Sequence, residues 1–140
     1  MTDLTLSVTR TIKAPIERVY NAWLDPSTLA QFMLPGEGMS VPKADTDPRV
    51  GGRFAITMAA GSDELPHGGE YKELNPHNRI VFTWESPFSI EGSTVTVELN
   101  EVAEGTQVEL THVKFPSEDS RNNHESGWAN ILEALNTVLS

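Results

Sequence analysis

The chain has 140 residues, no cysteine, and ten Lys plus Arg against twenty Asp plus Glu, which gives a formal net charge of −10. This length predicts a single domain over residues 1–140, and the 38% hydrophobic content argues against disorder. The acidic excess, with no basic cluster, disfavours nucleic acid and anionic membrane as partners, because both bind through cations. Without cysteine there is no disulfide or thiolate nucleophile. Since the N-terminal residues do not resemble a signal peptide and no apolar run of about 18 residues occurs, we expect a cytoplasmic protein.

The N-terminal third predicts one strand followed by two short helices. Leu4, Leu6 and Val8 alternate with polar residues, which is typical of a strand with one buried face. Pro15 suits the first position of a helix. The apolar stripe of that helix comprises Ile16, Val19, Tyr20, Trp23 and Leu24.

The second short helix has clear boundary signals. Asp25 followed by Pro26 reads as an N-cap and a first helical residue. This helix would turn Leu29 and Phe32 inward, and Pro35 with Gly36 would end it.

From Gly36 to Phe115, alternating apolar runs are separated by Gly, Pro, Asn and Asp, a pattern typical of hairpins. The connections are too short for crossover helices, so the sheet should be antiparallel. One face is polar and the other is aromatic and aliphatic. The apolar positions of these runs are Phe54, Ile56, Met58, Tyr71, Ile80, Phe82, Trp84, Val95, Val97, Leu99, Val108 and Leu110, with His112 at the same parity.

The segment from about Ser120 to Leu139 has the clearest helical periodicity in the sequence. Ser117, Ser120, or Asn122 paired with Glu125 would serve as its N-cap. A glycine inside a helix costs about 1 kcal/mol relative to alanine, so we expect another backbone to approach Gly127 closely. The apolar stripe of this helix comprises Trp128, Ile131, Leu132, Leu135, Val138 and Leu139.

These elements predict an α+β fold in which a curved antiparallel β-sheet wraps around a long C-terminal helix, with two short helices after the first strand. The apolar stripe of the terminal helix can be buried only against the apolar face of the sheet. Because a twisted sheet curves, a straight helix contacts its rims better than its middle. We therefore expect an apolar cavity between the helix and the sheet.

The order and spacing of several segments, spread over nearly the whole chain, resemble a known family. These segments are Gly51 to Phe54, Gly69 to Pro76, Arg79 to Trp84, Gly105-Thr106 and His124 to Trp128. The sequence is similar to the bacterial activator-of-heat-shock-protein-90-ATPase-like (AHSA-type) proteins of the START or Bet v 1-like superfamily, also called SRPBCC. The resemblance implies the helix-grip fold and a pocket for an apolar or amphipathic small molecule. The family often has paired tryptophans where this chain has Phe32 and Met33.

The predicted ligand-binding residues are inward positions near the middle of the fold. Each aromatic or aliphatic one of them is also a candidate for plain core packing. As a set they match ligand pockets, which are mainly apolar with a few polar groups. The set comprises Phe54, Met58, Tyr71, Phe82, Trp84, Leu110, His112, His124, Trp128 and Ile131.

His112 and His124 leave three alternatives open. Each imidazole is either satisfied by the backbone at the edge of the core, in contact with a ligand, or a general base. We predict no metal, because a third ligand is missing and His67 and His77 fall in predicted turns without metal-binding spacing. No cofactor is predicted either.

Glycine pairs and arginines offer two further candidate sites. Gly51-Gly52 and Gly68-Gly69 lack the features of a phosphate-binding loop and are interpreted as hairpin and bulge glycines. Arg53 and Arg79 either bind an acidic ligand group or pair with the many carboxylates.

Three functions compete at this stage. The first is a non-catalytic domain that binds a small hydrophobic molecule. The second is an enzyme of the cyclase or dehydratase kind found in the superfamily, with His112 or His124 as proton carrier. The third is a co-chaperone of the heat-shock ATPase, which only the family resemblance suggests. A homodimer is compatible with all three.

Overall fold

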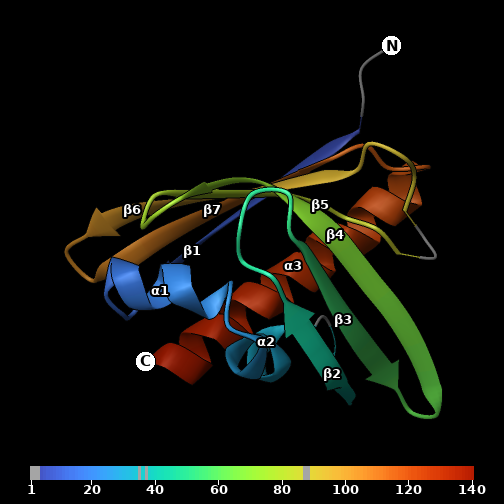
Figure 1. The fold of residues 1–140 in the computed structure, drawn as a ribbon, viewed down its shortest axis with the longest axis horizontal. Coiled ribbons are helices and arrows are strands. Elements are labelled where there is room, and N and C mark those ends of the chain that lie inside the picture. Colours follow the sequence, from blue (N-terminus) through green and yellow to red (C-terminus); the bar gives the residue numbers. More distant parts are fainter. Residues whose placement is uncertain (1–3, 35, 37, 87–88) are drawn as a thin grey trace.

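The computed structural model describes residues 4–34, 36, 38–86 and 89–140. The first strand is followed by two short helices, six further strands and a long terminal helix, as the sequence predicts (Figure 1). The strands are β1 (Thr5–Ile12), β2 (Met39–Thr46), β3 (Arg53–Ala60), β4 (Asp63–Asn75), β5 (Arg79–Thr83), β6 (Thr94–Val102) and β7 (Gly105–Val113). The helices are α1 (Ile16–Ala22), α2 (Pro26–Phe32) and α3 (Glu118–Leu139).

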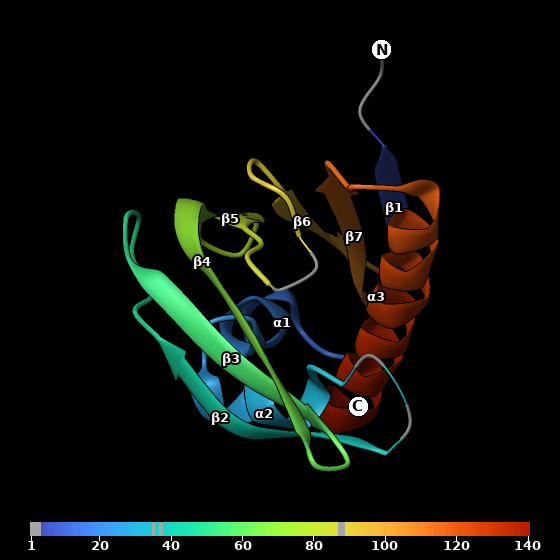
Figure 2. The same cartoon turned by 90° about the vertical axis from the view of Figure 1, so that its right-hand side faces the viewer.

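Within these described residues, the seven strands form one antiparallel sheet in the order β1-β7-β6-β5-β4-β3-β2. Figure 2 shows the sheet curling from β1, which lies beside α3, round to β3 and β2 on the other side. The helices α1 and α2 close one end of this curve. The structure thus confirms the predicted α+β helix-grip fold.

The alternating residues of the central strands form the core, as their period-two pattern predicts. Val95 and Val97 on β6 lie opposite His112 and Leu110 on β7 and share one face of the sheet with them. All four side chains are buried. Burial of such apolar side chains contributes roughly 1.5–3 kcal/mol each. These residues therefore form part of the buried, concave face of the sheet.

The two short helices begin close to the predicted residues. Pro15 is the N-cap of α1 instead of its first residue, and Asp25 caps α2 by accepting a hydrogen bond from the Thr28 backbone N–H at 3.0 Å. Helix α2 ends at Phe32. Pro35, which was expected to end it, lies outside the described residues.

Strand β4 is longer than its sequence pattern suggests. It begins at Asp63, directly after a tight turn in which Gly61 adopts a φ of 65°. The prediction that His67 lies in a turn was therefore wrong, and Gly68-Gly69 also lie inside the strand. A Cβ at Gly69 would come within 1.9 Å of the Thr83 carbonyl oxygen, so only glycine fits at this position of β4.

The terminal helix α3 buries the predicted stripe against the sheet and α2. Its buried residues include Trp128, Ile131 and Leu135. Ser117 is the N-cap and accepts a hydrogen bond from the Ser120 backbone N–H at 3.1 Å, which decides between the three predicted caps. Helix α3 packs on β1 and on α2. This arrangement places it along one rim of the curved sheet.

Candidate functional site

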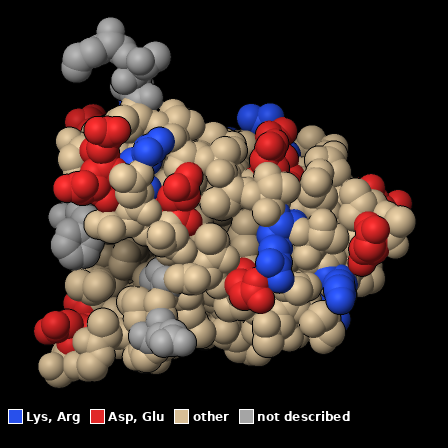
Figure 3. All heavy atoms as spheres, turned by 180° about the vertical axis from the view of Figure 1, so that it is seen from behind, with Lys and Arg blue, Asp and Glu red and all other residues tan. Residues whose placement is uncertain are grey.

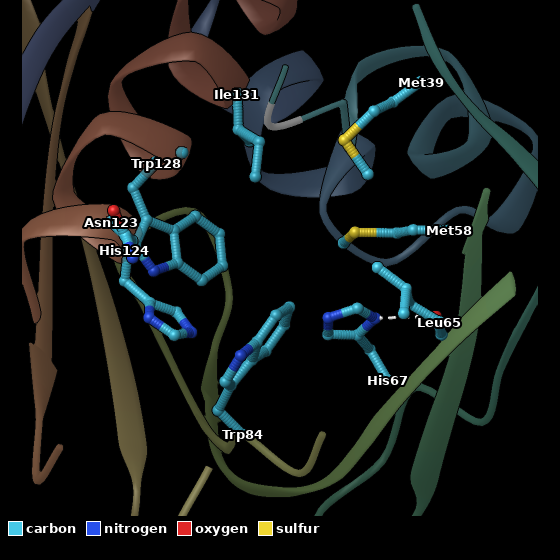
Figure 4. A pocket seen from close by; sticks show the side chains of 10 residues that line it. Met39, Met58, Leu65, His67, Trp84, Asn123, His124, Trp128 and Ile131 are labelled. Atoms are coloured by element: carbon cyan, nitrogen blue, oxygen red, sulfur yellow. Dashed lines mark hydrogen bonds between the residues drawn. The ribbon is translucent and has the colours of Figure 1, made fainter. Parts of the chain in front are cut away.

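A cavity of about 170 Å³ lies between α3 and the far arm of the sheet formed by β2, β3 and β4. It forms there because α3 rests on β1 and α2, while the sheet curls away toward β3 and β4 (Figure 2). Figure 4 shows side chains from α3 facing those from the far arm across this space. The wall consists of Met39, Met58, Leu65, His67, Trp84, Asn123, His124, Gly127, Trp128 and Ile131.

Trp84, which follows β5, provides one side of the cavity. Its ring centroid lies 5.0 Å from that of Trp128 and 5.2 Å from that of His67. The side chain is 4% exposed, and its indole Nε1 has no hydrogen-bond partner among the described residues. A buried donor without a partner is unusual, since most buried polar groups in folded proteins are hydrogen-bonded.

His67 reaches the cavity from β4. Its Nδ1 lies 3.0 Å from the carbonyl oxygen of Leu65, so Nδ1 carries the proton and donates to it. The other ring nitrogen, Nε2, is left as an acceptor, and Figure 4 shows the ring directed toward Trp84. Burial lowers the pKa of His67, with a smaller effect in the same direction from His124, while the hydrogen bond to Leu65 opposes both. The ring is therefore neutral at pH 7.

His124 reaches the cavity from the opposite side, on the second turn of α3. Its Nδ1 lies 2.7 Å from the carbonyl oxygen of Ser120, one helical turn earlier, so Nδ1–H donates to this oxygen. The other ring nitrogen, Nε2, has no hydrogen-bond partner among the described residues. The half-buried ring of His124 points toward Trp84 (Figure 4). Two imidazoles, each with Nδ1–H directed to a backbone carbonyl, thus line the cavity from α3 and from β4.

His112 has a different environment, because both of its nitrogens bind protein groups. The Trp128 indole N–H donates to Nδ1 at 3.0 Å, and indole is a donor only. Nε2 must then carry the proton and donate to Ser93 Oγ at 2.6 Å. Burial, assisted by the nearby His124, lowers the pKa of His112 to about 3. A neutral imidazole with both nitrogens engaged offers no free lone pair for proton transfer.

The structure places the predicted site residues in three groups. Met58, Trp84, His124, Trp128 and Ile131 line the cavity. Phe54, Tyr71 and Phe82 line a second void of about 10 Å³, which has room for at most one water, and Trp84 lines this void as well as the cavity. Leu110 and His112 line neither space, and both are 0% exposed.

Sequence reasoning missed half of the cavity wall. Leu65 and His67 alternate on β4, but Pro66 between them and the glycines after them suggested a turn. Met39 lies at the start of β2, which had no alternating apolar pattern. Gly127 forms part of the wall on α3, so the absence of a side chain there leaves open space.

The two arginines considered for an acidic ligand pair with carboxylates of the protein. Arg53 pairs with Glu85, and Arg79 lies 3.6 Å from both Glu73 and Glu98. All five side chains are well exposed to solvent. On the face seen in Figure 3, Lys and Arg side chains lie next to Asp and Glu and do not form a separate basic patch.

The described part of the chain contains neither a candidate metal cluster nor a candidate membrane-spanning helix. Within it, no three His, Asp or Glu side chains lie close enough together to hold a metal ion. No helix among these residues is long and apolar enough to cross a membrane.

Comparisons with solved structures agree with this fold. The chain is similar to a protein from Chromobacterium violaceum (30% identity, 97% of each chain covered, TM-score 0.87) and to one from Rhizobium loti (28%, 97% of this chain and 96% of the other, 0.80). It is also similar to the AHSA1-like protein from Aeromonas hydrophila (26%, 96% and 90%, 0.83). None of the curated proteins compared with the chain matches it.

The comparison with family models covers almost the whole chain. The family described as Activator of Hsp90 ATPase homolog 1-like protein matches residues 13–140, which include both short helices, six of the seven strands and α3. This is the family that the sequence resembles. The chain belongs to the Activator of Hsp90 ATPase homolog 1-like family.

Proposed function

We propose that this protein binds a small apolar molecule in the cavity between α3 and strands β2 to β4. The observation that carries the proposal is the size of this cavity, about 170 Å³, together with its apolar wall. An engineered protein cavity of about 150 Å³ lined by Leu, Ile and Phe stays dry and binds benzene. A cavity of this volume therefore suits a molecule of one ring or slightly more.

The shape of the wall supports binding of a rigid, flat molecule. Trp84 and Trp128 present aromatic surfaces on one side, and Met39, Met58 and Leu65 present flexible or branched aliphatic groups on the other (Figure 4). Methionine side chains adapt to irregular shapes and make favourable contacts with aromatic rings. Small aromatic ligands that bury most of their surface in such a pocket typically reach dissociation constants on the order of 10 µM to 1 mM.

Thermal unfolding with added toluene, indole and naphthalene tests the proposal. A ligand that binds the folded state alone raises the midpoint of unfolding in a concentration-dependent way. We expect at least one of these three probes to raise the midpoint at millimolar concentration. If none of them does so, the cavity is not a binding site for molecules of this class.

A cavity-filling variant links such binding to the site. Leu65→Trp places a large ring in the cavity from β4 and should abolish the ligand-dependent shift. Glu64→Trp is the matched control, because Glu64 is the exposed neighbour on the opposite face of the same strand. A shift that survives in Leu65→Trp would locate the ligand elsewhere.

The other two functions remain predictions. The family description names activation of the Hsp90 ATPase, and nothing in the geometry of the cavity bears on that activity. For the cyclase or dehydratase alternative, His124 Nε2 has no partner in the described part of the chain, whereas both nitrogens of His112 are engaged. Cytoplasmic localisation and a homodimer likewise remain predictions.

A further inference from the structure

The burial of the wall residues distinguishes the mouth of the cavity from its floor. Asn123 is exposed, and the other side chains near the mouth are half-buried. The side chains of Met58, Trp84, Trp128 and Ile131 are only 2–4% exposed. A ligand that enters from solvent therefore meets these four side chains at the bottom of the cavity.

The second void, of about 10 Å³, lies behind this floor. Among the described residues, Trp84 alone lines both the cavity and the void. All the residues around the void are buried, so solvent does not reach it directly. Since Trp84 belongs to the floor, the void continues the cavity inward, toward the short helices. The other residues around the void are Trp23, Leu29, Met33, Phe54, Ile56, Tyr71 and Phe82.

The indole ring of Trp84 contacts residues of both spaces. Its centroid lies 5.0 Å from that of Trp128 and 5.2 Å from that of His67, which line the cavity. It also lies 6.3 Å from the centroids of Phe54 and Phe82, which line the void. The ring therefore separates two apolar spaces that would otherwise be continuous.

The backbone at this position is held independently of the indole. The Trp84 backbone N–H donates to the Ser93 carbonyl oxygen at 2.9 Å, and Glu85 and Gly68 exchange two backbone hydrogen bonds at 2.8 Å. The indole Nε1 itself has no partner in the described part of the chain. A smaller apolar side chain at position 84 therefore leaves no polar group without its partner, and its main effect is to open space.

We propose that Trp84 limits the depth of the binding site, so that the protein selects compact apolar molecules of about one ring and excludes ligands with a long alkyl chain. This inference rests on the proposed function, since it defines the size class of the ligand in the same cavity. Without the indole, the cavity and the void form one deeper space that ends at Trp23 and Leu29.

Two phenylalkanols of different chain length measure the depth of the site. Isothermal titration compares 4-phenylbutanol with 6-phenylhexanol, and toluene is the reference that carries the same ring without the chain. Each methylene group that becomes buried raises the affinity about fourfold, so two of them raise it about 16-fold. In the wild type we expect the two phenylalkanols to bind within about twofold of each other, because the extra methylenes remain at the mouth.

Two substitutions of Trp84 test its role. In Trp84→Ala, 6-phenylhexanol should bind about 10- to 20-fold more tightly than 4-phenylbutanol, and in Trp84→Leu at least about fourfold more tightly. The ratio is taken within one protein, so a loss of ring contacts that affects both ligands cancels. The matched control is Trp23→Leu, because Trp23 is 3% exposed and lines the void but not the cavity. This control enlarges the void and keeps Trp84, so its ratio should stay within about twofold.

The outcomes distinguish this inference from the proposed function. A ratio that stays within about twofold in the Trp84 variants, or that rises equally in Trp23→Leu, overturns the inference and leaves an apolar binding site. A wild-type ratio of about 16 also overturns it, because the longer chain would then already fit. If toluene and both phenylalkanols fail to bind the wild type, the proposed function fails and the inference fails with it. Since circular dichroism checks that each variant is folded, Trp84→Leu decides the matter if Trp84→Ala does not fold.

Discussion

His112 links the sheet to the terminal helix through side-chain hydrogen bonds. It lies on β7 at 0% exposure, accepts from Trp128 on α3 and donates to Ser93 just before β6. Each partner satisfies one ring nitrogen, so the buried imidazole has no unpaired polar atom. Of the three alternatives left open for this residue, the structure supports a satisfied core histidine, although its partners are side chains instead of backbone groups.

The buried His112 should make stability depend on pH in a definite direction. Its pKa is lowered in the folded protein from the usual 6.5 to about 3, so between these values the unfolded chain binds more protons. The stabilisation is present above pH 6.5 and is lost as the pH falls toward 3. Between about pH 7 and pH 5 we expect His112 to lower the free energy of unfolding by about 2 kcal/mol.

Urea unfolding of the wild type and of His112→Gln at both pH values isolates this contribution. Glutamine accepts from the Trp128 N–H and donates to Ser93 but does not titrate, and the carboxylates are common to both proteins. The pH dependence of the variant should be smaller than that of the wild type. Equal pH dependence of the two proteins would show that His112 titrates as an exposed histidine does.

Residues outside helix α3 form hydrogen bonds with backbone groups at both of its ends. Ser117 caps its N-terminus, and Glu118 and Asp119 place negative charge in the first turn, where the helix dipole favours it. The last turn has no basic residue among its described positions. Instead, Arg18 on α1 donates to the carbonyl oxygen of Leu139 at 2.6 Å. The long helix thus depends on α1 for the positive charge at its C-terminus.

Removal of the N-cap should destabilise the protein measurably. Ser117→Ala leaves the Ser120 backbone N–H without its partner, and loss of a serine cap typically costs about 1 kcal/mol. Chemical denaturation should show this decrease in the free energy of unfolding. Asn122→Ala is the control, since Asn122 was an alternative cap in the sequence but lies inside the helix and is exposed. A larger effect at Asn122 than at Ser117 would contradict the assignment.

The whole molecule carries a net charge of −10, because Asp and Glu outnumber Lys and Arg by ten. The ion pairs in the described residues join side chains that are 36–78% exposed. Pairs of this kind contribute about 0–1 kcal/mol each. Repulsion among the excess carboxylates therefore outweighs them in the overall response to salt.

Salt should accordingly stabilise this protein. Raising NaCl from about 10 mM to 150 mM shortens the screening length from about 30 Å to about 8 Å, and the midpoint of thermal unfolding should rise by about 2–5 °C. The double variant Glu101→Gln with Glu104→Gln removes two exposed charges at one hairpin and should show a smaller rise. A midpoint that falls with salt would mean that attractive pairs dominate.

Local sequence patterns predicted the elements and much of the cavity wall. The stripe through Trp128, Ile131 and Leu135 and the alternation on β5 to β7 depend only on the geometry of a helix or a strand, so neighbouring residues reveal them. The same reasoning put Trp84 and His124 on the inner face. It failed at β4, where the signals of Pro66 and Gly68 for a turn were overridden by pairing with β3.

The sequence by itself determined the fold class, the order of the elements and the apolar face of each one, because these follow from periodicities of two and 3.6 residues. Only the tertiary structure decided that His67 faces the cavity and that His112 is buried and hydrogen-bonded to Trp128. Both outcomes depend on how far α3 stands from each strand. That separation is set by the curl of the sheet and by contacts between residues more than 120 positions apart in the chain, which no local pattern contains.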